Sequence, residues 1–441
     1  MSSPTTTRQL TRKPCGHILT NTNVWSADGQ WIYYDVRSDP AGSLFDGNRI
    51  ERVHVKTGTV EQIFESRNGA HCGVVTAAPH QDQVVFIAGP EFPTSDWTYG
   101  AAHRQGMLVS VLPNDRCAEH LEARNLTTPF TPGALRGGTH VHTFHPTSPY
   151  VAFTYDDAVL PTTAPSGYEG DVNQRNVGVA LLGKPVQVPD SHARNHSGSS
   201  FSVLVTRTVN QPAPGSDEIC KAFEDAWVGT RGYVKTDGTL QHLAIAFQGE
   251  VVLENGQHIH ELFISDLPTD LTVSGAGPIE GTATLRPHPP AGVVQRRLTY
   301  THRLPFPGIQ GPRHWVRSSP DGSRIAFLMK DRRGIVQLFV VSPNGGEIQQ
   351  ISQLKAPGVT SAFSWHPTGS WIAHASGTQL CCTHLDSGHT QIIPLGLSDH
   401  PPIRPEAVVF SPDGSQIAFV LQLTTHFGKY NQIFCAEWTN G

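Results

Sequence analysis

Hydrophobic and polar positions alternate in short segments that recur along the chain. Four segments share an apolar strand, a turn of the Ser-Pro-Asp-Gly kind and a second apolar strand: VWSADGQWIYYD from Val24, VRSSPDGSRIAFLM from Val316, FSWHPTGSWIAHAS from Phe363 and VVFSPDGSQIAFVL from Val408. Two looser copies begin at Val74 and His142. Alternation with period two is typical of β-strands, and recurrence after roughly 45 residues is typical of propeller blades.

Each copy continues into a second hairpin, as in RIERVHVKTGTVEQIF and QLFVVSPNGGEIQQIS. The Lys-Thr-Gly and Pro-Asn-Gly sequences at these turns supply residues that accept a positive φ. Four consecutive antiparallel strands make one propeller blade, so the six copies predict six blades.

The interval from Pro146 to Pro320 is too long for a single blade. It contains four further segments with the pattern of strands: Ser199–Val209, Leu243–Val252, His260–Pro268 and Arg296–Thr301. We predict that these four segments form one more blade, which brings the number to seven. We also expect an insertion around residues 210–235, with a helix at Ser216–Trp227.

The two ends of the chain complement each other. The last copy stops after three strands, whereas Arg8–Lys13 (RQLTRK) resembles the outer strand RRLTYT and precedes the first blade. Because a closed ring leaves no sheet edge unpaired, we predict that Arg8–Lys13 completes blade seven. Residues 1–441 are then a single all-β domain, a seven-bladed β-propeller.

Composition and charge narrow the range of partners. The net charge of -5 and the pI near 6.5 leave no basic stripe for phosphates, so nucleic acid is not an expected partner. Apolar runs such as Val84–Gly89 are far too short to span a membrane, so no membrane association is expected. The first residues lack the apolar segment of a secretory signal, and we therefore expect a cytoplasmic protein.

The cysteines indicate no particular site, whereas the number of histidines is unusual. The 7 cysteines are odd in number and form no CxxC pair, so neither a disulfide framework nor a thiolate zinc site is indicated. Histidine is unusually frequent, with 23 residues. His258 and His260 lie on a predicted outer strand, and their spacing alone predicts no site.

A ring of polar residues is predicted near one mouth of the channel. Residues six positions before each turn share one height on the innermost strands: Asn21, Gly73, His140, His314, Ser361 and Glu406. His71 lies two residues before Gly73. His142 lies two residues after His140 and on the same side of its strand, because side chains alternate with period two. Imidazoles with a carboxylate suit a borderline divalent metal, while a solvated channel lining explains the same pattern.

Arginines accompany this ring. Arg136 precedes His140, and Arg313 is adjacent to His314. A guanidinium pairs well with planar anions, so these residues indicate a ligand that bears a carboxylate, although surface ion pairs would also account for them. No GxxxxGK[ST] loop and no GxSxG elbow occurs, which disfavours P-loop hydrolysis and hydrolase-type peptidases.

Several long motifs carry a family resemblance that runs from about Gln9 to Trp438. They are LTNTNVWSADGQWIYYDVR, GAHCGVV, LRGGTHVHTFHP, SDEICKAFEDAWVG, GVVQRRLTYTHR, PRHWVRSSPDGSRIAFLMKD and AVVFSPDG. With these motifs the chain resembles the YidR family of bacterial propeller proteins, which is related to oligogalacturonate lyase and, more distantly, to the TolB propeller.

The resemblance to the lyase is weaker and implies particular residues. HVHTFHPTSPYVAFTYDD looks like its metal-binding segment, which implies His140 and His142 as ligands, with His314 as a further histidine. The lyase uses a glutamine just upstream, where this chain has Arg136, Gly137 and Gly138. A divalent metal of the Mn²⁺ kind is the one cofactor that the resemblance implies.

Two hypotheses of different classes follow. The first is a metal-assisted lyase, a carbon–oxygen lyase acting on an oligouronide, with metal on His140, His142 and His314. In it, Arg136 or Arg313 holds the substrate carboxylate, and His71 or Glu406 is the base. The second is a non-catalytic TolB-like propeller that binds a protein or a small molecule, since one fold serves many functions.

Overall fold

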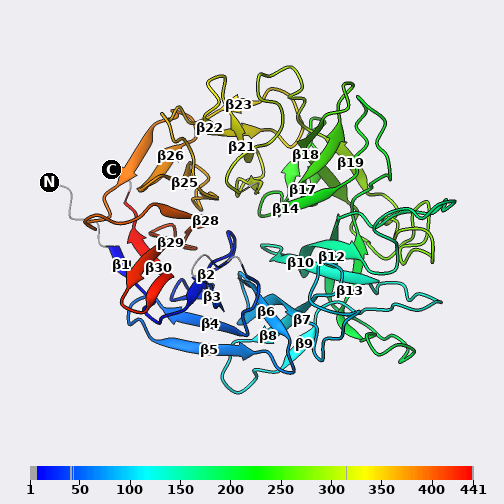
Figure 1. The fold of residues 1–441 in the computed structure, drawn as a ribbon. Helices are drawn as coiled ribbons and strands as arrows, with labels where there is room; N and C mark the ends of the chain where they lie inside the picture. The colour runs from blue at the N-terminus through cyan, green and yellow to red at the C-terminus, as the bar shows by residue number, and fades with distance from the viewer. Residues whose placement is uncertain (1–6, 40–41, 43, 314, 440–441) are drawn as a thin grey trace.

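The described strands form a closed ring. The computed structural model describes residues 7–39, 42, 44–313 and 315–439, and these form seven four-stranded antiparallel sheets around a central opening (Figure 1). The prediction of a seven-bladed β-propeller is confirmed. No helix in these ranges is long and apolar enough to cross a membrane.

Blades one to three follow one another in chain order, and the strands of each blade run in sequence order from the axis outward. Blade one contains β2 (Gly16–Ile18), β3 (Trp31–Arg37), β4 (Arg49–His54) and β5 (Val60–Glu65). Blade two contains β6 (His71–Ala77), β7 (Gln83–Gly89), β8 (Gln105–Ser110) and β9 (Ala118–His120). Blade three contains β10 (Gly137–Phe144), β11 (Tyr150–Asp157), β12 (Asn176–Val186) and β13 (Gly198–Leu204).

Blades four to six differ in regularity. Blade four contains β14 (Ala222–Trp227), β17 (Leu243–Val252), β18 (His258–Leu267) and β19 (Val294–Arg297), with a small hairpin of β15 (Tyr233–Val234) and β16 (Leu240–Gln241) beside it. Blade five contains β20 (Arg317–Ser318), β21 (Ile325–Lys330), β22 (Val336–Val341) and β23 (Gln349–Gln350). Blade six contains β24 (Ser364–Trp365), β25 (Trp371–Ser376), β26 (Gln379–His384) and β27 (Thr390–Ile393).

Blade seven is built from both ends of the chain. Its strands are β28 (Ile403–Phe410), β29 (Gln416–Thr425), β30 (Gly428–Glu437) and, outermost, β1 (Thr7–Gln9). β1 pairs antiparallel with β30, with Arg8 opposite Cys435. The backbone N–H of Leu10 also donates to Ile433 over 2.8 Å. The predicted closure is therefore confirmed.

Blade four corrects two predictions. Residues Ser216–Trp227 do not form a helix, because Ala222–Trp227 is the innermost strand of the blade. This strand lies inside the segment that was expected to be an insertion. The segment predicted as the first strand of this blade, Ser199–Val209, instead contributes β13 to the outer edge of blade three. Tertiary pairing with β17 overrides the helical pattern of the local sequence.

The turns explain why the repeat was visible in the sequence. In blade five, Ser319 Oγ donates to Asp321 Oδ1 over 2.5 Å and accepts the N–H of Arg324 over 3.0 Å. Ser411 and Asp413 make the same contact in blade seven. The Ser-Pro-Asp-Gly sequence thus satisfies its own polar groups at each turn between the first two strands.

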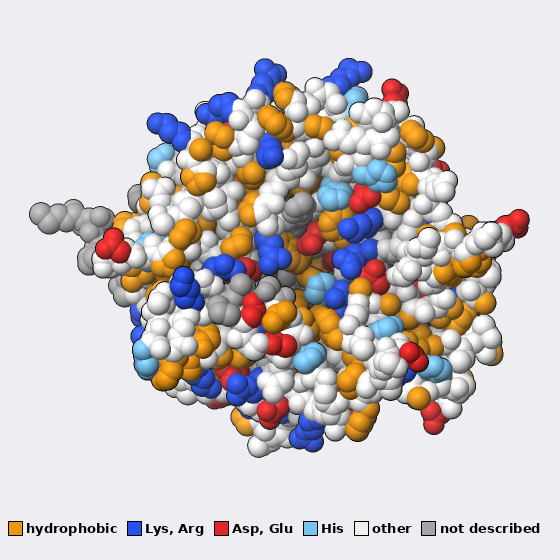
Figure 2. Space-filling view, in the orientation of Figure 1, with side chains coloured by type: hydrophobic (Ala, Val, Ile, Leu, Met, Phe, Trp, Pro, Cys, Tyr) orange, Lys and Arg blue, Asp and Glu red, His pale blue; other side chains and the backbone are white. Residues whose placement is uncertain are grey.

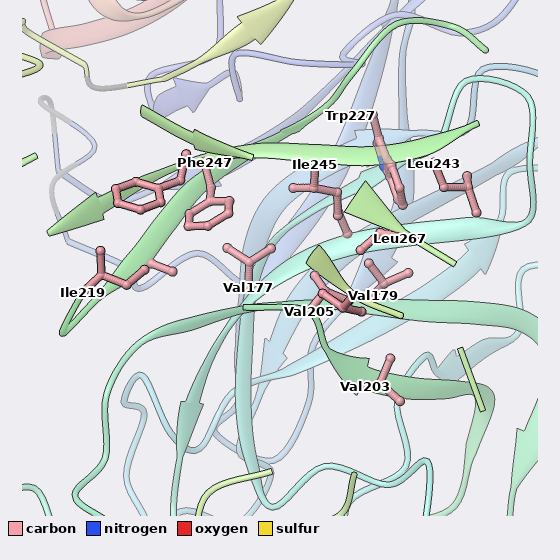
Figure 3. Close-up of a cluster of buried hydrophobic side chains, with 14 of the residues drawn as sticks. Val177, Val179, Val203, Val205, Ile219, Trp227, Leu243, Ile245, Phe247 and Leu267 are labelled. Atoms are coloured by element: carbon pink, nitrogen blue, oxygen red, sulfur yellow. The ribbon is translucent and has the colours of Figure 1, made fainter. Parts of the chain in front are cut away.

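The core lies between blades rather than at the axis. Buried apolar clusters fill the interfaces of neighbouring blades, and the one between blades three and four joins Val177 and Val203 to Phe247 and Leu267 (Figure 3). Each blade therefore presents two apolar faces to its neighbours. The axis itself is left for other side chains.

Three innermost strands share a bulge that changes which side chains face the channel. The register shifts between Gly73 and Thr76 in β6, between His140 and Thr143 in β10, and between Phe223 and Ala226 in β14. At the bulges, Val74, Val141 and Glu224 have φ values of 58°, 50° and 55°. Blade four thus carries an acid where blades two and three carry valine.

Candidate functional site

A cavity of about 310 Å³ lies at one mouth of the channel, where Figure 2 shows charged and histidine side chains gathered around the central hollow. Strands and loops of several blades build it. Its lining residues include Asn21, Asp35, Arg37, Phe45, Val74, Tyr99, Arg104, His140, Val141, Arg313, Trp315 and Glu406. Of the predicted site residues, the structure brings His140, Arg313 and Glu406 together here.

His140 is held neutral at the wall of the cavity. Its pKa lies well below the usual range because the ring is buried and because Arg104 and Arg175 lie near it. The buried Nδ1 atom has no hydrogen-bond partner among the described residues. A neutral imidazole with a free ring nitrogen can accept a proton or a hydrogen bond from a ligand.

Arg104 is a buried cation without a carboxylate partner. The residue is 8% exposed, and Nε donates to the carbonyl oxygen of Thr139 over 3.0 Å. In the described part of the chain no carboxylate lies within ion-pair distance of its guanidinium. Burial accordingly lowers the pKa of Arg104. A buried guanidinium that contacts the side chain of Tyr99 and has no carboxylate within ion-pair distance favours an anion in the adjacent cavity.

The loop that carries Tyr99 and Arg104 reaches the cavity because of a glycine. A Cβ atom on Gly138 would collide with the carbonyl oxygen of Ala101 and would lie 2.9 Å from that of Arg104. Glycine at this position therefore lets the loop pack directly on β10. Gly138 thus allows the loop to bring an arginine to the site.

The two carboxylates of the cavity already have cationic partners. Asp35 accepts a hydrogen bond from Arg37 over 2.9 Å and one from the N–H of Val74 over 3.0 Å. Glu406 pairs with Arg404 over 2.8 Å and with the exposed Arg313 over 4.0 Å. The remaining buried oxygen of Glu406, Oε2, has no partner among the described residues.

Aromatic side chains supply the apolar part of the wall. Phe45 stacks on Tyr99 with ring centroids 4.5 Å apart, and Trp315 lies under the guanidinium of Arg317 at 4.9 Å. Aromatic faces beside a few polar groups are typical of small-molecule sites.

His142 does not join His140 in the cavity, which corrects the prediction that both face the same side. The bulge at Val141 breaks the alternation of β10. The His142 ring instead turns between blades two and three, where Nε2 lies 2.6 Å from Glu122 Oε1, and the residue is fully buried. A metal on both rings would require this pair to separate.

Arg136 is also absent from the lining, contrary to the prediction that it binds a ligand carboxylate. Its side chain is fully buried and pairs with Asp157 over 2.7 Å. It also donates to the carbonyl oxygen of Thr282 and stacks over Phe130. Arg136 fastens β10 and β11 to a loop of blade four.

Of the two remaining predicted site residues, one lies near the cavity and the other lies outside the described residues. His71 begins β6, and its ring centroid lies 6.3 Å from that of Tyr99, so it is near the cavity without lining it. His314 lies outside the described residues. Its neighbours Arg313 and Trp315 both line the cavity.

Sequence reasoning missed an acidic pair on β14. Glu224 Oε2 and both carboxylate oxygens of Asp225 are buried without partners among the described residues. Burial raises the pKa of Asp225 to about 7, and it also raises that of Glu224. Burial lowers the pKa of the neighbouring Arg317 to about 10. The sequence FEDAW contains both acids, but its local pattern predicts a helix in an insertion.

The described donors of the cavity do not fit a divalent metal by themselves. Within the described ranges, three or more His, Cys, Asp or Glu donors converge at Cys220, Glu250 and His258, away from the cavity. In the cavity, His140 stands among arginines, and Asp35 and Glu406 are already paired. A metal there would need His314 as a second imidazole.

Comparisons with known proteins show to which family the chain belongs. A family model described as "Protein of unknown function (DUF3748)" matches residues 71–196, which contain β6 to β12. The chain is 44% identical over 419 residues to "Uncharacterized protein YidR" of Escherichia coli (strain K12), with 94% of each chain covered. The chain belongs to the YidR family.

A solved lyase structure resembles this YidR family member in fold. "Oligogalacturonate lyase in complex with manganese" superposes with a TM-score of 0.55 at 12% identity, covering 98% of this chain and 93% of that one. A putative TolB from Agrobacterium tumefaciens gives a TM-score of 0.41 at 12% identity, covering 89% and 99%. At 12% identity, the likeness to the lyase shows only that this YidR family member has the propeller fold. It shows nothing about the chemistry of this YidR family member.

Proposed function

We propose that the chain binds a uronate-type oligosaccharide in the channel-mouth cavity and cleaves it by β-elimination. The observation that carries the proposal is Arg104, a buried guanidinium that faces the cavity without a carboxylate partner. A ligand carboxylate would complete this ion pair, and Arg313 at the exposed rim would assist its capture. The lyase class was implied by the resemblance in sequence.

The other polar groups suit a sugar. Asn21 Oδ1, His140 Nδ1 and Glu406 Oε2 are buried acceptors without partners among the described residues. The hydroxyl groups of a sugar would donate hydrogen bonds to them, because buried polar atoms are costly when left unpaired. Phe45 and Tyr99 provide apolar faces for the ring.

The charge balance of the cavity makes His140 the proposed base, in place of the predicted His71 or Glu406. Without ligand, the nearby arginines depress the pKa of His140. A bound carboxylate neutralises part of this positive charge, so the pKa of His140 rises when substrate is present. The imidazole is then a better base at the moment when it is needed.

The elimination is balanced by groups of the cavity. His140 takes the proton from C5, the C–H electron pair becomes the C4–C5 double bond, and the bond from C4 to its glycosidic oxygen breaks. Tyr99 is the phenol that can return a proton to the departing oxygen. Arg104 stabilises the negative charge that spreads onto the carboxylate in the transition state.

A divalent metal is not required by any of these steps. The Mn²⁺-type ion that the resemblance implies belongs to an alternative in which His140 and His314 would hold the metal and the base would be His71 or Glu406. Its chemistry would be to polarise the same carboxylate.

A second candidate is binding without turnover, by a propeller that senses or carries the ligand or docks a protein. The position of His142 favours it, because the pair of histidines implied by the lyase pattern does not face the cavity. Fold alone does not distinguish the two candidates.

An ultraviolet assay for the unsaturated product tests the proposal. The protein is incubated with a panel of oligogalacturonates, with chelator and with added Mn²⁺. We expect an absorbance gain that a His140→Ala variant loses and that an exposed control, His389→Ala, retains. Ligand binding without any absorbance gain would leave only the non-catalytic candidate.

A further inference from the structure

A cluster of four side chains of metal-binding types lies on blade four, apart from the channel-mouth cavity. Cys220 precedes β14, Glu250 lies on β17, and His258 and His260 lie on β18. Glu250 is directly opposite His260 in the ladder, and the N–H of Cys220 donates to the carbonyl oxygen of Glu250 over 3.1 Å. Three neighbouring strand segments thus bring the four side chains together.

The donor atoms converge on one carboxylate. Cys220 Sγ and His258 Nδ1 lie 3.4 Å and 2.8 Å from Glu250 Oε1, and His260 Nε2 lies 3.4 Å from Oε2. The donor atoms of Cys220, Glu250 and His258 all lie within 4.8 Å of one another. In a tetrahedral zinc site, ligand atoms at about 2.0–2.3 Å from the metal are roughly 3.3–3.8 Å apart.

We propose that Cys220, Glu250, His258 and His260 bind one zinc-type divalent cation. Thiolate and imidazole donors select zinc over manganese or magnesium, which prefer oxygen ligands. The carboxylate offsets the charge of the ion. The His258 side chain is 55% exposed, so the ion has a path from solvent.

The site would have a structural consequence for the channel. Cys220 lies four residues before Glu224 in the chain, and the hairpin of β17 and β18 is the rest of blade four. A metal bound by all three segments ties the beginning of β14 to that hairpin. It would therefore fix the strand that carries Glu224 and Asp225.

The sequence pattern alone does not predict this cluster of four side chains. The cysteine has no CxxC partner, and about thirty residues separate it from the glutamate. Only the pairing of β14 with β17 and of β17 with β18 makes the three segments neighbours. All seven cysteines are free, so no disulfide competes for the thiol.

Metal binding by tag-free, full-length protein tests the proposal. We expect one equivalent of Zn²⁺ per chain after dialysis, and a thiolate-to-metal charge-transfer absorption when Co²⁺ replaces it. Cys220→Ser and His258→Ala should each weaken binding by more than the roughly 10–100-fold that loss of an outer partner costs. His258→Ala removes a half-exposed ring and keeps the test valid if the cysteine variant does not fold.

Matched variants separate this site from the channel. Cys117→Ser changes an exposed cysteine outside the cluster and should keep the metal and the cobalt absorption. His140→Ala should keep both as well, because it alters only the cavity of the proposed function. Absence of the cobalt absorption in the parent, or equal metal content in Cys220→Ser and Cys117→Ser, would overturn the proposal.

Discussion

Blades five and six follow the sequence repeat closely, whereas the innermost strand of blade four departs from it and carries two acids. The innermost strands of blades five and six are two residues long, Arg317–Ser318 and Ser364–Trp365. That of blade four is six residues long and contains Glu224 and Asp225. The difference teaches that the repeat records what packs the ring together, while a strand that departs from the repeat can carry buried acids that the repeat does not predict. If this is correct, damage to the regular part should cost stability, and damage near the channel should change pH response and binding.

The largest loss should come from opening the ring. Deletion of residues 1–13 removes β1 and the buried Leu10, together with hydrogen bonds to Ile433 and Gln432. Each net backbone hydrogen bond contributes about 1 kcal/mol, against a total stability of about 5–15 kcal/mol. We expect a much lower melting temperature or aggregation through the exposed edge of β30. Deletion of residues 1–5 is the control, and a thermal melt of the longer deletion that equals the parent's would contradict the role of β1.

A core truncation in the regular region should be the next largest effect. Leu328 of β21 is fully buried in the cluster between blades five and six. Leu328→Ala should lower the free energy of unfolding by about 2–5 kcal/mol, since it removes buried methyl groups and leaves a cavity. Denaturant unfolding measures it. A loss under about 1 kcal/mol would show that this interface is loosely packed.

The acid of blade four should make stability depend on pH. Asp225 has a pKa raised to about 7 in the folded chain, so between about pH 4 and 7 the folded state binds more protons than the unfolded state. Its contribution to stability therefore falls as pH rises through this window. From pH 5 to pH 7, Asp225→Asn should gain ~2 kcal/mol relative to the parent. Exposed Asp386→Asn should show no such gain, and a pH-independent difference for Asp225→Asn would refute the assignment.

A buried histidine of blade six should act in the opposite direction. His374 is fully buried, its Nε2 lies 2.8 Å from Thr383 Oγ1, and burial lowers its pKa to about 4. The unfolded state binds more protons below about pH 6.5, so stability is lost as pH falls toward 4. His374→Gln should reduce this loss by ~1.5 kcal/mol between pH 6.5 and 5, as measured by denaturant midpoints. Exposed His389→Gln should leave the profile of the parent intact.

The smallest effect on stability should come from the rim of the cavity. Arg313 is exposed and lies 4.0 Å from Glu406, so Arg313→Ala should change the free energy of unfolding by about 0.5 kcal/mol or less. A large loss would mean that Arg313 is a structural residue rather than one that awaits a ligand.

The ring was predictable because its information is local and repeated. Apolar alternation, the Ser-Pro-Asp-Gly turns and the similarity of Arg8–Lys13 to an outer strand predicted the blades and the closure. Blade four was not predictable in detail, because FEDAW has the local pattern of a helix and only its partner β17 makes it a strand.

The sequence predicted the height of the candidate site along the innermost strands. Counting from the turns brought Asn21, His140 and Glu406 to one cavity. Counting failed for His142 because a bulge is a property of the paired backbone and not of the alternation. Arg104 lies on a loop that packs closely on Gly138. The sequence repeat does not predict this contact.

Calorimetric titration with a uronate oligosaccharide tests the central claim, that the channel-mouth cavity accepts a carboxylate ligand through Arg104. Tag-free protein is titrated with trigalacturonate and with a neutral trisaccharide of the same linkage. We expect binding of the acid only, weakened by about 10-fold or more in Arg104→Met, because a hydrogen bond to a charged group contributes about 1.5–3 kcal/mol. Equal affinity for the neutral sugar, or unchanged affinity in a folded Arg104→Met protein, would contradict the account.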